Sequence, residues 1–158
     1  MSAPDRVLIT AAAADLLVRL VDRHGPVMFH QSGGCCDGSS PMCYPDGDFI
    51  VGDRDALLGV LDVGQGVPVW ISGPQHQVWK HTQLIIDVVP GRGSGFSLEA
   101  PEGMRFLSRS RDFTHDENDL LDAAPVITGA GYERGERPSA RGPVVADMPA
   151  GHAGSVTG

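Results

Sequence analysis

Short runs of strand-forming residues dominate the middle of this chain. They are separated by glycine, proline and aspartate, which interrupt regular structure and favour turns. The runs extend over Asp48–Val51, Leu57–Val63, Pro68–Ser72, Leu84–Val89 and Phe96–Leu98. The pattern predicts an α+β fold that is mainly β and is built from short strands.

One amphipathic helix is predicted before these strands, over residues 7–23. Its apolar side chains recur close to helical spacing, with Thr10 as the expected N-cap and Gly25 as the stop. The next residues, Pro26–His30, are typical of a short buried strand. The segment Gln75–Thr82, directly after Pro74, has the length of about two helical turns, but its apolar period is too short to decide between helix and loop.

A length of 158 residues suits a single domain, which we expect to comprise residues 1–114. From about His115 onward the chain is poor in large apolar residues and rich in Gly, Pro, Ala and charge, as in Gly131–Gly142. Such a composition buries too little surface to offset its ordering entropy, so residues 115–158 are expected to be mostly a disordered tail. The acidic start of that tail, Asp116–Asp119, either caps a short helix through Leu121 or is solvated.

The charge and the apolar pattern exclude several classes of partner. A net charge of −8 and a pI near 5.0 oppose binding to nucleic acid, which requires a basic surface. No run approaches the roughly 20 apolar residues that span a bilayer, and Met1–Ala14 lacks the order of a secretory signal. We therefore expect a cytoplasmic protein with no membrane partner. Its odd number of cysteines, 3, favours free thiols or metal ligands over disulfides.

The densest cluster of reactive side chains lies in the loop after the predicted strand Pro26–His30. This loop holds Cys35, Cys36 and Cys43, among glycines that let the backbone approach a ligand closely. Thiolates are soft ligands, so the expected metal is zinc, copper(I) or iron. Adjacent cysteines in extended backbone face opposite ways, so Cys43 with either Cys35 or Cys36 is the easier pair of ligands.

Histidines complete the predicted ligand set. His30 directly precedes the loop, and His76 and His81 follow the Gly73–Pro74 turn. These two later histidines are not separated by the four positions that align ligands on a helix. The alternative is that the cysteines are packing residues, because free cysteine is often buried. The predicted metal ligands are Cys35, Cys36, Cys43, His30 and His81.

Two long strings carry a resemblance to a known family. The strings His30–Tyr44 (HQSGGCCDGSSPMCY) and Trp79–Gly95 (WKHTQLIIDVVPGRGSG) resemble the bacterial family called domain of unknown function 779, over about residues 7–113. Members of that family are often encoded beside aldehyde and alcohol dehydrogenases. The resemblance therefore implies such a dehydrogenase as the partner and implies no particular mechanism.

The order of elements also resembles the HesB-like A-type iron–sulfur carriers. The matching pieces are the opening helix, the Gly-Gly-Cys loop, and the segments Gly66–Ile71, Ile86–Val89 and Ser94–Leu98. This resemblance implies short twisted β-sheets with the N-terminal helix packed on them. The carriers have a Cys-Gly-Cys pair where this chain has Glu102–Phe106, so only Cys35 matches a carrier ligand. An iron–sulfur cluster is therefore less expected than a bound zinc, iron or copper ion.

Three hypotheses about function follow. The favoured one is an accessory protein, not an enzyme, that binds a metal and matures, protects or regulates an aldehyde or alcohol dehydrogenase. The second is an enzyme whose loop thiolate attacks an aldehyde-type electrophile, with His30 or His81 as the base. The third is a protein-binding domain with structural cysteines. The sequence has no nucleophile elbow and no phosphate-binding glycine motif, which argues against a hydrolase or a nucleotide-binding protein. Separately, the exposed sheet edges of the expected fold predict a homo-oligomer.

Overall fold

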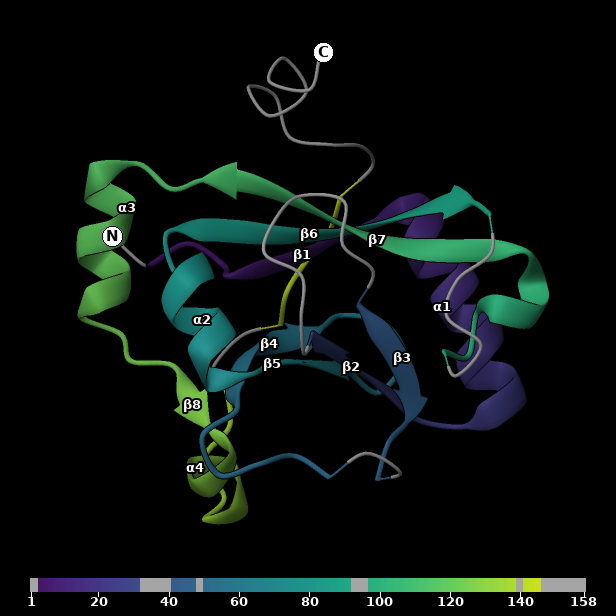
Figure 1. Cartoon of the computed structure of the whole chain (residues 1–158), viewed down its shortest axis with the longest axis horizontal. Coiled ribbons are helices and arrows are strands. Elements are labelled where there is room, and N and C mark those ends of the chain that lie inside the picture. Colours follow the sequence, from purple (N-terminus) through teal and green to yellow (C-terminus); the bar gives the residue numbers. More distant parts are fainter. Residues whose placement is uncertain (1–2, 32–40, 48–49, 92–96, 139–140, 146–158) are drawn as a thin grey trace.

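Two β-sheets face each other across a hydrophobic core in a computed structural model of the chain (Figure 1). The structure describes residues 3–31, 41–47, 50–91, 97–138 and 141–145. The elements in chain order are β1 Val7–Thr10, α1 Ala11–His24, β2 Val27–Gln31, β3 Met42–Pro45, β4 Ala56–Leu61, β5 Val67–Ile71, α2 Gly73–Trp79, β6 Thr82–Pro90, the 3₁₀ helix η1 Ala100–Glu102, β7 Met104–Asp112, α3 His115–Asp122, β8 Ile127–Thr128, α4 Gly129–Glu133 and β9 Val144–Val145. Strand residues outnumber helical ones, which confirms the predicted α+β, mainly β fold class. Among these helices, none is both long and apolar enough to span a bilayer.

The four-stranded sheet has the order β7-β6-β1-β9. β6 and β7 pair in antiparallel register along their whole length. β1 runs parallel to β6, and β9 pairs in parallel with the other side of β1. The first strand of the chain therefore lies inside this sheet, between two strands that come much later in the sequence.

The five-stranded sheet has the order β3-β2-β5-β4-β8. β2 is antiparallel to β3 and parallel to β5, while β4 is antiparallel to both β5 and β8. The register of β4 against β5 shifts between Leu57 and Gly59. A side chain at Gly59 would meet Val7 Cγ1 of the other sheet at 2.9 Å, so glycine allows the two sheets to approach closely there.

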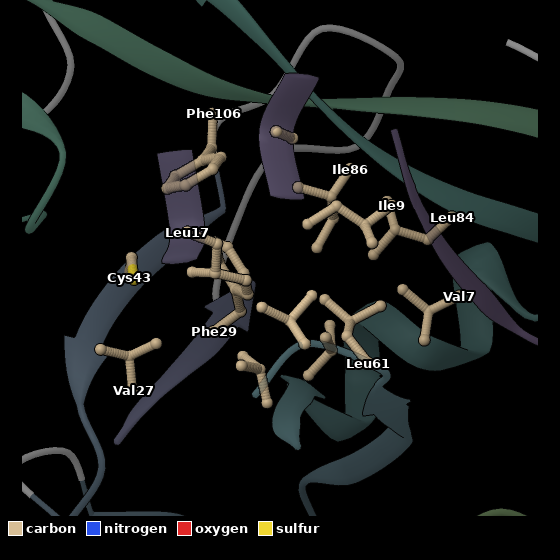
Figure 2. Packing of buried hydrophobic residues seen from close by; sticks show 14 of the residues in the cluster. Val7, Ile9, Leu17, Val27, Phe29, Cys43, Leu61, Leu84, Ile86 and Phe106 are labelled. Carbon is tan, nitrogen blue, oxygen red and sulfur yellow. The ribbon is translucent and has the colours of Figure 1, made fainter. Parts of the chain in front are cut away.

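Apolar side chains from both sheets and from α1 fill the space between the sheets (Figure 2). Phe29 of β2 and Phe106 of β7 meet edge to face, with ring centroids 4.9 Å apart. Leu17 of α1 is fully buried in the same cluster. Because side chains alternate along a strand, the residues between these core positions face the outer side of each sheet. A smaller cluster of Met28, Leu57 and Trp70 forms separately from the main core.

Helix α1 has the predicted N-cap and the predicted glycine stop. Thr10 Oγ1 accepts a hydrogen bond from the Ala13 amide, and Gly25 follows the helix with φ of 83°. The strand predicted at Pro26–His30 is β2. The segment Gln75–Thr82, which the sequence left undecided, begins within helix α2. The prediction was wrong for residues 7–10, which form strand β1 and not the start of the helix. All four of these residues are buried, so apolar spacing alone could not separate strand from helix.

Three of the runs predicted in the middle of the chain cover most of β4, β5 and β6; they are Leu57–Val63, Pro68–Ser72 and Leu84–Val89. Residues 50–51 and 97–98 are not strands, and the remaining residues of those two predicted runs lie partly outside the described residues. Strands β3 and β7 were not predicted. β3 falls within the segment that the cysteines and glycines suggested to be a loop.

The residues after 114 continue the fold. α3 begins at a capping box, in which Thr114 Oγ1 accepts from the Glu117 amide and the Glu117 side chain accepts from the Thr114 amide. β8 extends the five-stranded sheet and β9 extends the four-stranded one. The expected boundary after residue 114 therefore needs correction, because strand pairing and capping hold residues that carry few large apolar side chains. Residues 146–158 of the expected tail lie outside the described residues.

Candidate functional site

His30 lies on the outer face of the five-stranded sheet, one residue before the end of β2. It stands opposite Met42 of β3 and beside Trp70 of β5. Its chain neighbours Phe29 and Gln31 face the other way, into the space between the sheets. Only 3% of His30 is exposed, so its imidazole is shielded from water.

A carboxylate orients this imidazole. His30 Nε2 lies 3.0 Å from Asp55 Oδ2. Because an ionised carboxylate only accepts hydrogen bonds, Nε2 carries the proton of this bond. The same Oδ2 atom accepts a hydrogen bond from the Gly52 amide at 2.9 Å. Asp55 is therefore held in place by its own turn while it holds the histidine ring.

Helix α4 supports the turn that carries Asp55. The Gly129 amide donates to the Asp55 carbonyl at 2.8 Å, and the Ala130 amide donates to the Asp53 carbonyl at 3.1 Å. A Cβ atom on Gly129 would lie 1.9 Å from the carbonyl oxygen of Gly52. Glycine at position 129 is therefore what allows α4 to pack this closely against the turn.

Aromatic side chains lie on the same outer face as His30. Trp70 and Tyr132 of α4 meet edge to face, with ring centroids 5.3 Å apart. Met28, which precedes His30 by two positions on β2, is buried in the same cluster. A low local dielectric strengthens a hydrogen bond between paired polar groups. The His30–Asp55 pair thus lies at the border of an apolar cluster, and the Gly52 amide keeps the carboxylate oriented.

Cys43, a predicted ligand, faces the opposite side of the sheet. It stands opposite Phe29 in the ladder and is fully buried in the core between the sheets (Figure 2). Burial, with the nearby charge of Glu99, raises the pKa of its thiol far above the usual range. Its amide donates to Ser97 Oγ at 2.9 Å. The sheet therefore separates the Cys43 thiol from the imidazole of His30.

His81, another predicted ligand, is exposed at the start of β6, and its Nδ1 donates to Asn118 Oδ1 of α3 over 3.2 Å. His76 of α2 has a buried Nδ1 with no hydrogen-bond partner among the described residues, and burial lowers its pKa. Cys35 and Cys36 lie outside the described residues. Within the part of the chain that the structure describes, no group of three His, Cys, Asp or Glu side chains is placed to hold a metal ion.

Sequence reasoning found His30 and missed its partner Asp55. The two residues are 25 positions apart, and no local pattern relates them. They meet because β5 lies between β2 and β4, so that Trp70 is beside both His30 and Leu57, and Asp55 precedes Leu57 by two positions. Only the strand order could have revealed this pair.

Asp87 is a second partly buried carboxylate, on the outer face of the four-stranded sheet. It accepts hydrogen bonds from Thr10 Oγ1 at 2.9 Å and from Arg109 Nε at 2.8 Å. Burial opposes its ionisation, but the hydrogen bonds from Arg109, the Val88 amide and Thr10 outweigh burial and lower its pKa. Because Thr10 also caps α1, this carboxylate ties the start of the helix to the sheet.

A family model matches most of the chain. Searches among curated proteins and among solved structures gave no match. The matching model covers residues 16–111, which include β2, the segment with the three cysteines, Asp55 and β5. The chain belongs to the family described as domain of unknown function (DUF779).

Proposed function

We propose that His30, oriented by Asp55, is one ligand of a transition-metal site whose other protein ligands are the thiolates of Cys35 and Cys36. The glycines at positions 33, 34 and 38 would let a tight turn bring these two adjacent thiolates to one metal ion. The 3.0 Å contact between His30 Nε2 and Asp55 Oδ2 carries this proposal. A carboxylate that accepts from one nitrogen of a metal-binding histidine fixes the ring and makes the other nitrogen a stronger ligand.

The short connection from β2 to the first two cysteines supports the same site. β2 ends at Gln31, and Cys35 follows four positions later. Four residues span at most about 14 Å, so the length of the chain permits this thiol to reach the end of the strand that carries His30. An imidazole with two thiolates favours zinc, copper(I) or iron over magnesium or calcium.

Cys43 and His81 are left out of this ligand set. The Cys43 thiol is buried in the core on the other side of the sheet, and burial keeps it protonated. His81 directly precedes β6 of the other sheet and lies beside Asn118. A metal bound by His30 would need a large rearrangement of the fold to reach either side chain.

Elemental analysis and absorption spectra of anaerobically purified protein test this metal site. We expect stoichiometric zinc, copper or iron in the wild type and its loss in His30→Ala and in Cys35→Ala. Asp55→Asn should weaken metal binding by roughly 10- to 100-fold, because the ring loses its orienting carboxylate. Cys43→Ala is the matched control and should keep its metal. Loss of metal in Cys43→Ala, with retention in His30→Ala, would contradict the proposed ligand set.

The same pair also suits a second function, that of a general base. An imidazole oriented by a carboxylate can deprotonate a nearby thiol, which would then attack an aldehyde-type electrophile. In that case the wild type is metal-free, one cysteine reacts rapidly with iodoacetamide near neutral pH, and His30→Ala slows that reaction. A metal-free protein in which every cysteine reacts slowly would contradict both functions.

The proposed role of the metal site is to serve an aldehyde or alcohol dehydrogenase, as the family resemblance implies. An accessory protein of this size could mature, protect or regulate such an enzyme. Cross-linking in the source cells, followed by purification of the tagged chain, tests the partner. We expect a dehydrogenase to be recovered with the wild type and less with His30→Ala. Recovery of no dehydrogenase would remove the partner from the proposal, whatever the result of the metal analysis.

A further inference from the structure

A half-open cavity of about 620 Å³ is lined by neither His30 nor Asp55. Its walls come from residues 3–7, from β4, and from the segments on either side of β8 and before β9. The volume lies within the range of small-molecule sites, which is roughly 300–1,000 Å³, and far exceeds what an inorganic ion needs. Much of the wall is apolar and includes Val7, Leu57, Leu58 and Ile127.

Two arginines line this cavity without an acidic partner. Arg6 donates from one terminal nitrogen to the carbonyls of Leu121 at 3.3 Å and Ala124 at 2.6 Å. Arg137 donates to the carbonyls of Tyr132 and Glu136, at 2.8 Å and 2.7 Å, and lies over the Tyr132 ring. Within the described part of the chain, neither guanidinium forms an ion pair with Asp or Glu. Backbone carbonyls hold both groups in place and leave their charges uncompensated.

The cavity has one acidic side chain, that of Asp5. Burial raises the pKa of this carboxyl, so its environment disfavours the charged form. The two guanidinium groups therefore exceed the acidic charge on the wall. In a protein with a net charge of −8, such a local positive excess in a partly apolar cavity attracts an anionic ligand.

We propose that this cavity binds a small organic anion, namely a carboxylate attached to an apolar chain or ring. The carboxylate would accept hydrogen bonds from Arg6 and Arg137, and the apolar body would lie against Leu57, Leu58 and Ile127. Planar guanidinium groups match the geometry of a carboxylate well. The cavity is built from residues other than those of the proposed metal site, so either proposal can fail without the other.

Titration of isotope-labelled protein, followed by two-dimensional amide NMR, tests the proposal with benzoate as the probe. We expect saturable shifts at residues of β4 and at Ile127. Benzyl alcohol has the same ring without the charge, and phosphate has the charge without the ring, so both should bind at least tenfold more weakly. Equal binding of benzoate and benzyl alcohol, or no saturable shift with benzoate, would overturn the proposal.

Variants locate the site. Arg137→Gln should weaken benzoate binding by about tenfold, because one charge-assisted hydrogen bond is lost. Arg134→Gln is the matched control, because Arg134 is exposed, pairs with Glu136 and does not line the cavity. Ala124→Phe narrows the cavity without changing its charge and should also weaken binding. Unchanged affinity in both Arg137→Gln and Ala124→Phe would place benzoate elsewhere and refute the assignment.

Discussion

The buried thiol of Cys43 predicts a specific loss of stability at alkaline pH. In the folded protein, burial and the charge of Glu99 raise its pKa far above its usual value of about 8.5. The unfolded chain releases this proton above about pH 8.5, whereas the folded chain keeps it. The folded state therefore binds more protons than the unfolded state above that pH, and the free energy of unfolding falls as pH rises. Below about pH 8.5 the contribution of the thiol is fully present.

The size of this loss follows from how far the pH lies above the pKa of the thiol in the unfolded chain. Each unit above pH 8.5 removes about 1.4 kcal/mol, so about 2.7 kcal/mol is lost by pH 10.5. That is a large share of a typical domain stability of roughly 5–15 kcal/mol. Other groups also titrate in this range, so the informative quantity is the difference in unfolding free energy between the wild type and Cys43→Ala. The cavity that Ala leaves in the core adds a cost that does not depend on pH.

Urea unfolding under reducing conditions, followed by fluorescence at pH 7.5, 8.5, 9.5 and 10.5, measures this difference. We expect the wild type to lose about 2.7 kcal/mol more than Cys43→Ala between pH 7.5 and 10.5. Parallel curves for the two proteins would mean that the folded chain ionises Cys43 as readily as the unfolded chain. That result would refute the placement of this thiol in the core and would reopen its assignment as a ligand.

Two further predictions concern the supports of the site and of α1. Gly129→Ala should lower the unfolding free energy by about 1–3 kcal/mol or more, since its Cβ would lie 1.9 Å from a backbone oxygen. The control Gly52→Ala in the supported turn should cost much less, because its Cβ meets only Asp55 atoms at 3.7–3.8 Å. Equal losses in urea unfolding would contradict the close packing of α4. For Asp87, whose folded-state pKa is lowered, stability is fully present above about pH 4 and is lost as pH falls further, so Asp87→Asn should flatten the stability profile below pH 4. An unchanged acid profile in urea unfolding of Asp87→Asn would show that the Arg109 and Thr10 hydrogen bonds do not hold that pKa down.

Elements with local signals in the sequence were the predictable part of the fold. α1 was found because Thr10 and Gly25 mark its ends, and β2, β4, β5 and β6 were found because they carry apolar runs. β7 was missed because Arg105, Arg109 and Arg111 alternate with its inward-facing residues and dilute the apolar signal. That strand is defined by its long pairing with β6, which no local pattern encodes.

The candidate site shows the same division between local and non-local information. His30 could be singled out because it ends an apolar strand just before the cysteines. Asp55 could not, because its approach to His30 depends on the order in which β2, β5 and β4 pair. The direction of the Cys43 side chain was equally hidden, since it follows from the register that sets Cys43 opposite Phe29.

The position of β1 inside its sheet also determines when this sheet can form during synthesis of the chain. β1 is made first, but its neighbours are β6 and β9, so the sheet cannot close until residue 145 has left the ribosome. At typical elongation rates, roughly 4–15 s pass between the synthesis of Val7 and that of its partner Leu84. During that interval β1, whose four residues are all buried in the folded protein, has two unpaired edges. The nascent chain is therefore most vulnerable to aggregation before its last third emerges, and a chaperone that shields the first ten residues would protect it best.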